Sequence, residues 1–233
     1  PTLIRPLTAL HKLSYAEVAG PSRVEWFVSH FWGHPFIDTC AALEKHARRM
    51  TGGTRPWQST AYWVCTFSNN QYEVQAELGD GQWDKSSFYL ALQSETCRGT
   101  CMVLDERLFP LERSWCLFEL LQTMLRAENH ARSEQGAFEG MLFCTASGIM
   151  NHGDAGSEVS LRIGQRLATL RLEDAKASCL QDKQMIDSLV ISEMGNFDQI
   201  NHKLREQFAA ALRASKAATL DRFRVIESEL GIA

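Results

Sequence analysis

The sequence predicts an α/β fold in which a parallel sheet is covered by helices on both faces. Two observations lead to this prediction. Short segments rich in β-branched and aromatic residues alternate along the chain with segments whose apolar residues recur every three or four positions. The chain has 233 residues, of which 45% are hydrophobic, and this is enough to build one substantial core.

Four of the expected strands follow from composition alone, at residues 24–29, 62–67, 100–105 and 141–145. A short fifth strand is expected at residues 168–172, where a helical pattern ends. Helices are expected between and after the strands, at residues 7–18, 36–50, 86–92, 114–125, 159–170, 182–194, 197–214 and 216–230. Residues 126–138 are polar and are predicted to be mobile.

The organisation predicted from these elements is one domain with additions at both ends. The chain contains no internal repeat, low-complexity tract or flexible linker. Residues 1–23 are predicted to form an N-terminal lead-in, residues 24–214 the domain, and residues 215–233 a C-terminal helical tail.

Composition also restricts the surroundings in which we expect the protein. A formal net charge of −4 argues against general binding to nucleic acid or to anionic membranes. No apolar run reaches the roughly 18 residues that a membrane-spanning helix needs. The seven cysteines are an odd number, and several lie inside strand-like segments, as free thiols do in a reducing compartment. We therefore expect a cytoplasmic protein. Whether further sequence precedes Pro1 stays open.

The most informative stretch begins where the third expected strand ends at Asp105. Pro110 breaks the chain, and Ser114 can serve as the N-cap or as a first-turn residue of the helix that follows. Trp115 and Glu119 are four residues apart, so they share one stripe of that helix, one turn from each other. Five strands suit the flavodoxin-like order 2-1-3-4-5, whose ligand crevice lies between the ends of the first and third strands. The loops at residues 29–32 and 105–115 are therefore predicted to converge.

Several sequence blocks resemble a TIR (Toll/interleukin-1 receptor) domain. They are Phe-Val-Ser at the end of the first strand, Val-Leu-Asp at the end of the third, and Ser-Trp-Cys-Leu-Phe-Glu-Leu at 114–120. The last of these matches the S-x-WC-x-x-EL pattern of the family, with a shorter gap after the serine. The chain also resembles TIR-like proteins of unicellular eukaryotes that carry SHxWG, YWxCxFxxNQ and VLD…PLxRxWCLFEL blocks. The resemblance covers residues 22–214 and implies a three-layer sandwich with a five-stranded parallel sheet in the order 2-1-3-4-5.

The resemblance also implies an activity, because one branch of the family cleaves NAD⁺ at the nicotinamide–ribose bond with the glutamate of this block. Carried over, the catalytic residue is Glu119, NAD⁺ is a substrate rather than a bound cofactor, and self-association through TIR surfaces is expected. The chain departs from the family in its first loop and in residues 69–85, which do not match the usual loop pattern. The residues expected to contact substrate are His30, Phe31, Trp32, Asn70, Asp105, Ser114 and Trp115.

This chemistry needs only one carboxylate, because nicotinamide leaves as a neutral base without a proton. Glu119 would stabilise the positive charge that develops on the ribose. Trp32, Phe31 or Trp115 could stack on the nicotinamide or on the adenine, and a cationic pyridinium over an indole ring would gain roughly 0.5–2 kcal/mol. Hydrolysis and cyclisation of the product both stay open.

Other interpretations of the same residues stay open as well. The alternatives for Glu119 are a solvated helix residue or the ion-pair partner of Arg113 or Arg126, and the alternative for Asn70 and Asp105 is to cap turns. The alternatives for the whole chain are a TIR-like scaffold that self-associates without catalysis and a module that senses NAD⁺ or a related nucleotide. No metal site is expected, because no second Cys/His pair at matching spacing accompanies Cys97 and Cys101. The chain also has neither a P-loop nor a dinucleotide-binding glycine motif.

Overall fold

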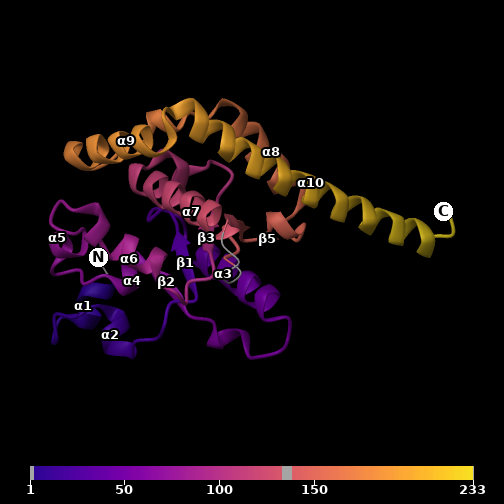
Figure 1. Ribbon diagram of the computed structural model, residues 1–233. Helices are drawn as coiled ribbons and strands as arrows, with labels where there is room; N and C mark the ends of the chain where they lie inside the picture. The colour runs from indigo at the N-terminus through magenta and orange to yellow at the C-terminus, as the bar shows by residue number, and fades with distance from the viewer. Residues whose placement is uncertain (1–2, 133–137, 233) are drawn as a thin grey trace. The chain divides into compact units, whose positions relative to one another are not determined.

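The protein is an α/β fold whose five-stranded sheet is flanked by helices (Figure 1). A computed structural model describes residues 3–132 and 138–232. The strand order is β2-β1-β3-β4-β5, which confirms the predicted order of the first four strands, but the fifth strand is not the segment that was predicted. The strands are β1 (Trp26–Ser29), β2 (Tyr62–Val64), β3 (Thr100–Val103), β4 (Met141–Thr145) and β5 (Gly148–Ile149).

The sheet is mostly parallel, but its last strand is not. β1 and β2 run parallel, with Phe27 opposite Trp63, whereas β5 pairs antiparallel with β4, with Thr145 opposite Gly148. The prediction of a fully parallel sheet is therefore wrong at this edge. Only Ala146 and Ser147 connect β4 to β5, and a connection this short can join only antiparallel strands.

The fifth strand predicted at residues 168–172 is also wrong. That segment contains the end of α8 and the start of a 3₁₀ turn, Leu172–Asp174. Leu167 and Leu172 are buried on either side of the junction, so the apolar character that suggested a strand anchors a helix end instead. β2 is likewise shorter than predicted, because the chain turns into a helix at Cys65.

Helices occupy most of the remaining chain. They are α1 (Ile4–Thr8), α2 (Tyr15–Ala19), α3 (Phe36–Thr51), α4 (Cys65–Ser68), α5 (Val74–Glu77), α6 (Ser87–Gln93), α7 (Ser114–Arg132), α8 (Ser157–Thr169), α9 (Leu180–Met194) and α10 (Phe197–Glu229). None of these described helices combines the length and the apolar character that crossing a bilayer requires.

Three helix predictions need correction. The N-terminal helix predicted at 7–18 is two short helices, because the chain turns at Lys12, which has a positive φ of 52°. The segment predicted to be mobile from residue 126 is helical as far as Arg132, and residues 133–137 lie outside the described part. The helices predicted at 197–214 and 216–230 are one continuous helix, α10, because Ser215 and the small residues around it do not interrupt the pattern.

The described chain divides into two compact units. The first unit contains Pro1–Ser29, Ser59–Cys101 and Glu119–Met141. Its aromatic core stacks Phe27 on Trp63, with ring centroids 4.7 Å apart, and Trp63 meets Phe88 edge-on at 5.1 Å. These rings bring β1, β2 and α6 together, which explains why strands of only three or four residues are held firmly.

Arg126 is the main polar anchor inside the first unit. Its guanidinium donates to the carbonyls of Leu92, Ser94 and Cys97 and lies 4.4 Å from the ring centroid of Phe138. Burial raises the pKa of the Cys97 thiol, so Arg126 lies against neutral groups. Since the last carbonyls of a helix have no partner within it, Arg126 completes the end of α6.

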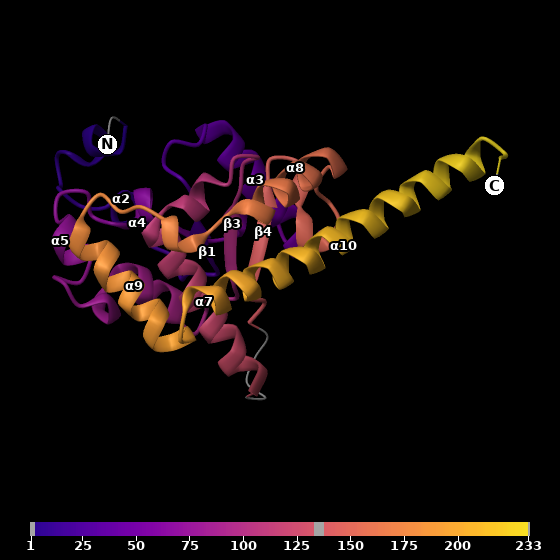
Figure 2. The same ribbon diagram turned by 90° about the horizontal axis from the view of Figure 1, so that it is seen from above.

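The second unit contains His30–Gln58, Met102–Phe118 and Leu142–Ala233. In its interior Phe143 of β4 packs against Phe208 of α10, with ring centroids 4.4 Å apart. Helices α8 and α9 lie beside α10 in both views (Figures 1 and 2). The helices therefore cover β4 with apolar side chains from the first half of α10.

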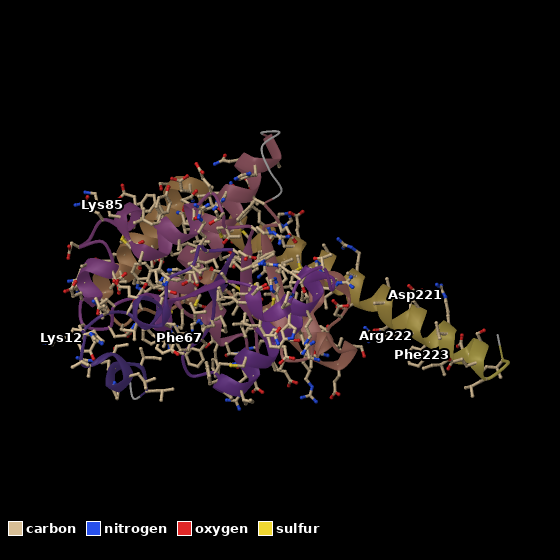
Figure 3. The ribbon with its side chains drawn as sticks, turned by 90° about the horizontal axis from the view of Figure 1, so that it is seen from below. Lys12, Phe67, Lys85, Asp221, Arg222 and Phe223 are labelled. Carbon is tan, nitrogen blue, oxygen red and sulfur yellow. The ribbon has the colours of Figure 1, made fainter. Side chains whose placement is uncertain are left out.

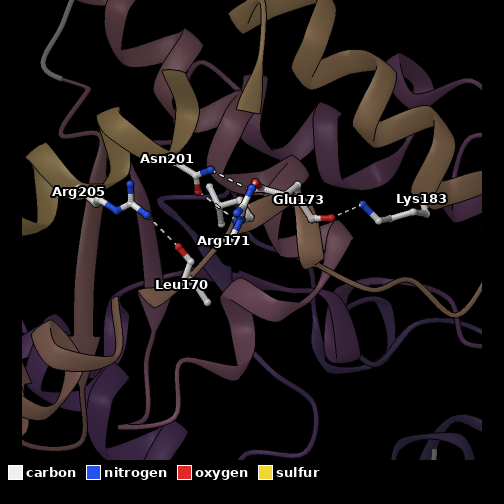
Figure 4. A network of polar contacts seen from close by, with 7 residues as sticks. Leu170, Arg171, Glu173, Lys183, Asn201 and Arg205 are labelled. Carbon is white, nitrogen blue, oxygen red and sulfur yellow. Dashed lines mark hydrogen bonds and ion pairs between the residues drawn. The ribbon is translucent and has the colours of Figure 1, made fainter. Parts of the chain in front are cut away.

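A polar network around Glu173 ties the helices of the second unit together (Figure 4). Asn201 Nδ2 donates to Glu173 Oε2 at 2.9 Å, Arg171 Nε donates to Oε1 at 2.8 Å, and Lys183 Nζ donates to the Glu173 carbonyl at 3.0 Å. Burial raises the pKa of the Glu173 carboxyl, but the hydrogen bonds, with that of Asn201 first, outweigh it and leave the pKa below its usual value. The charged form is therefore the one that the fold favours.

Candidate functional site

The two loops that were predicted to converge do so within the second unit. The thiol of Cys116, in the first turn of α7, donates to the carbonyl of His30 at 3.7 Å. The rings of Phe31 and Phe109 lie 5.1 Å apart. The loop that follows β1 therefore packs against the segment between β3 and α7. This is the arrangement that places a ligand crevice at the carboxyl ends of strands in open α/β sheets.

Trp32 and Arg113 form the exposed part of this junction. The Arg113 guanidinium lies 5.7 Å from the ring centroids of both Phe31 and Trp32, and Trp32 is 56% exposed. The sequence pattern gave no reason to select Arg113, which stands just outside the helix. The site thus presents an indole and a cation side by side on its surface.

The backbone on either side of Arg113 is fixed by a short parallel bridge. Ser114 N–H donates to the carbonyl of Lys176 at 2.9 Å, and Lys176 N–H donates to the carbonyl of Glu112 at 2.8 Å. Arg113 has an extended backbone directly after the 3₁₀ turn that ends at Glu112. The Glu112 carboxylate forms an ion pair with Arg166 at 3.1 Å, whereas the Arg113 guanidinium lies beside the rings of Phe31 and Trp32.

Trp115 is held by a partner that sequence reasoning missed. Its indole Nε1 donates to Asp182 Oδ2 of α9 at 3.0 Å, and its ring meets Phe118 edge-on at 5.5 Å. The two residues are 67 positions apart, and no local pattern links them. Both the polar edge and one side of the indole are therefore engaged within the second unit.

Ser114 is a first-turn residue of α7, one of the two positions predicted for it, and it makes no capping bond. It is fully buried as the first residue of α7, and its hydroxyl finds no hydrogen-bond partner among the described residues. A buried hydroxyl without a partner costs about 1–3 kcal/mol, so this position is held by the packing around it.

Asp105 caps a turn, which was the alternative to substrate contact. Its Oδ1 accepts from the backbone N–H groups of Arg107 at 3.2 Å and Phe109 at 3.3 Å. These bonds shape the segment that carries Phe109 to Phe31. His34, in the loop that follows β1, lies with its Nδ1 3.2 Å from Thr39 Oγ1.

Glu119 and Asn70 belong to the first unit. Glu119 is 4% exposed, so the interpretation of a solvated helix residue is wrong. Its backbone carbonyl accepts from Thr123 Oγ1 at 2.7 Å. Asn70 caps a turn by accepting from the N–H of Tyr72 at 3.0 Å, and its amide donates to the carbonyl of Lys12 at 3.0 Å. The polar atoms of the Asn70 amide are thus used by the fold.

Each unit contains a cavity. A cavity of about 250 Å³ in the second unit is lined by Glu112, Arg166, Thr169, Leu170, Arg171, Asp174 and Lys176. A cavity of about 300 Å³ in the first unit is lined by residues of the N-terminal segment with Tyr62, Trp63, Ser68 and Glu77. None of the predicted site residues lines either cavity. Among the described residues, no three His, Cys, Asp or Glu side chains gather as metal ligands would.

Comparisons of the chain with protein-family models, with curated proteins and with solved structures give no match.

Proposed function

We propose that this protein is a TIR-like NAD⁺ nucleosidase, which cleaves the nicotinamide–ribose bond with Glu119 as its single catalytic carboxylate. The observation that supports this proposal best is the convergence of the loops after β1 and β3 at the start of α7. The Trp115–Glu119 block occupies the first turns of that helix, as the resemblance implies. Open α/β sheets bind their ligands at such a junction.

The burial of Glu119 suits the charge that the reaction develops. Departure of neutral nicotinamide leaves an oxocarbenium-like ribose, and a carboxylate held away from water stabilises such a cation more strongly than a solvated one. With the side chain 4% exposed, the reaction needs the atoms that cover the carboxyl to move when substrate binds. Self-association, which the resemblance also implies, is one way to supply that movement.

The contacts of Trp32 favour stacking on the adenine of NAD⁺ over stacking on its nicotinamide. A guanidinium already lies against this ring, and its positive charge disfavours a second cation such as the nicotinamide pyridinium. Adenine is neutral and the diphosphate of NAD⁺ is anionic. We therefore assign the adenine to Trp32 and the diphosphate to Arg113.

The proposal is tested by measuring the release of nicotinamide from NAD⁺. The release is followed by chromatography at high protein concentration with a crowding agent. We expect Glu119→Gln to lower kcat by about 10²–10³-fold, because the shape of the side chain is kept and its charge is lost. Trp32→Ala should raise KM with a smaller effect on kcat, since stacking on the adenine is lost equally in ground and transition states. Phe36→Ala is the matched control, because Phe36 is a similarly exposed aromatic residue of the second unit.

Two results would contradict the proposal. One is full turnover by a folded Glu119→Gln variant, and the other is absence of turnover by the assembled wild-type protein. The burial of Glu119 is also compatible with a second candidate, a module that binds NAD⁺ without cleaving it because the carboxyl stays covered. Calorimetric binding of NAD⁺ that is lost in Arg113→Gln, without release of nicotinamide, would support this second function.

A further inference from the structure

One face of α10 packs against the second unit in the first part of the helix, and the same apolar stripe continues, exposed, along its last turns. The buried residues of α10 recur every three or four positions and end at Ser215. The same spacing then passes through Thr219, Phe223, Ile226 and Leu230. Residues 220–232 are all exposed, and the last turns of α10 run clear of α8 and α9 (Figures 1 and 2).

The exposed stripe has the spacing of a coiled coil. Thr219, Phe223, Ile226 and Leu230 are separated by four, three and four residues, which is the alternation of a and d positions in a heptad. Phe223 is 58%, Ile226 49% and Leu230 67% exposed. Figure 3 shows Phe223 on these last turns, beside Asp221 and Arg222. Large apolar side chains repeated along one face of a helix mark a surface that is covered when it functions.

The charged residues beside the stripe are arranged for a second copy of the same helix. With Phe223 at position a, Arg222 is at g and Glu227 at e. In a parallel pair, position g of one helix faces the following position e of the other helix. Arg222 of each copy therefore faces Glu227 of its partner, and the two-fold symmetry gives two such pairs in the dimer. Residues 216–230 carry three basic and three acidic side chains, so neither an acidic nor a basic partner is favoured.

We propose that residues 216–230 of α10 pair with the same segment of a second copy as a parallel two-stranded coiled coil. The remaining charges of the segment do not oppose this arrangement. Asp221 and Arg224 lie on the outer face and pair with each other at 2.9 Å. Arg222 donates one N–H to the carbonyl of Gly153 at 2.7 Å, and a guanidinium with five donors can keep this bond while it contacts Glu227 of the partner.

The size of the stripe indicates a weak dimer. The exposed apolar side chains offer about 400 Å² on each helix, which is below the usual size of a stable interface. We expect a dissociation constant of roughly 10–100 μM, so that monomer and dimer exchange over an accessible range of concentration. Free helices of this length are marginal in water, and dimerisation should therefore also increase the helix content of the last turns.

Sedimentation velocity of the full chain between about 5 and 500 μM tests the proposal. The wild-type sedimentation coefficient should rise with concentration. Phe223→Glu should raise the dissociation constant by at least about 30-fold, because each dimer loses two buried rings. Val225→Glu is the matched control: Val225 is 57% exposed on the same turns but lies off the stripe, so its dissociation constant should change less than about threefold. Circular dichroism checks that both variants keep α10.

A charge exchange tests the orientation of the pair. The substitution Glu227→Arg places a positive charge opposite Arg222 of the partner and should weaken the dimer. Adding Arg222→Glu to the same chain should restore the dimer. In an antiparallel pair, Arg222 would face Glu229 instead, and Glu229→Arg would be the variant that Arg222→Glu restores. That result would overturn the parallel arrangement. A wild-type chain that stays monomeric to 500 μM with α10 folded, or a dimer that Phe223→Glu leaves intact, would overturn the proposal as a whole.

Discussion

Arg126 offers the sharpest test of the energetics of the first unit. The side chain is 7% exposed, and its guanidinium is the donor for three backbone carbonyls at and after the end of α6. Arg126→Met keeps a long apolar stem but removes the charge and every donor. The carbonyls of Leu92 and Cys97 belong to buried residues, so they are poorly placed to recruit water.

The expected loss can be worked out from these contacts. An unsatisfied buried carbonyl costs about 1–3 kcal/mol, so the two buried carbonyls and the half-buried carbonyl of Ser94, partly relieved by relaxation, give about 3–5 kcal/mol in the free energy of unfolding. For a chain of this length, this corresponds to a decrease in Tm of about 6–20 °C. Arg126→Lys keeps a single cationic head and should lie between the wild type and Arg126→Met.

Urea denaturation and thermal melting followed by circular dichroism measure the effect. Arg213→Met is the matched control, because Arg213 is exposed on α10, and it should change the free energy of unfolding by less than about 0.5 kcal/mol. A decrease in Tm of only 1 or 2 °C for Arg126→Met would refute the reasoning, since it would mean that the three carbonyls find other donors.

Three further predictions concern other contacts. Asp182→Ala removes the acceptor of the Trp115 indole and should lower the free energy of unfolding by about 1 kcal/mol, measured by urea denaturation, with Asp182→Asn closer to the wild type. Because the pKa of Glu173 is lowered in the fold, its ionised carboxylate stabilises the folded state. This contribution is fully present above the unfolded pKa of about 4.3 and is lost as the pH falls through the folded pKa. Glu173→Gln should therefore be less stable than the wild type near pH 7, by up to about 1 kcal/mol, and this difference should shrink in melts as the pH falls below about 4.3 toward the folded pKa. Only the two exposed thiols, Cys40 and Cys179, should react quickly with Ellman's reagent in the native protein; burial raises the pKa of Cys40, so Cys179 should react first.

Much of the fold could be predicted because each element carries its own local signal. The strand at 141–145 was predicted correctly to the residue, and the starts of α3 and α7 follow from apolar periodicity after a proline or a serine. The convergence of the loops after β1 and β3 followed from the strand order. Such features depend on neighbours in the sequence and on one topological rule.

The parts of the candidate site that were not predicted depend on residues far apart in the chain. Asp182 reaches Trp115 across 67 positions, and Arg113 is directed to Phe31 and Trp32 because Lys176 fixes the backbone beside it. Asp105 and Asn70 looked equally suited to a ligand or to a turn, and only the positions of nearby N–H groups decided for the turn.

The sequence by itself determined the α/β class, the first four strands and the helix that carries Trp115 and Glu119, because propensity and periodicity act over a few residues. Tertiary structure alone decided that the last strand is antiparallel, that Glu119 is withdrawn from water, and that α10 is one helix whose final stripe lies exposed. These outcomes depend on which surfaces remain uncovered after packing, and no local pattern specifies them.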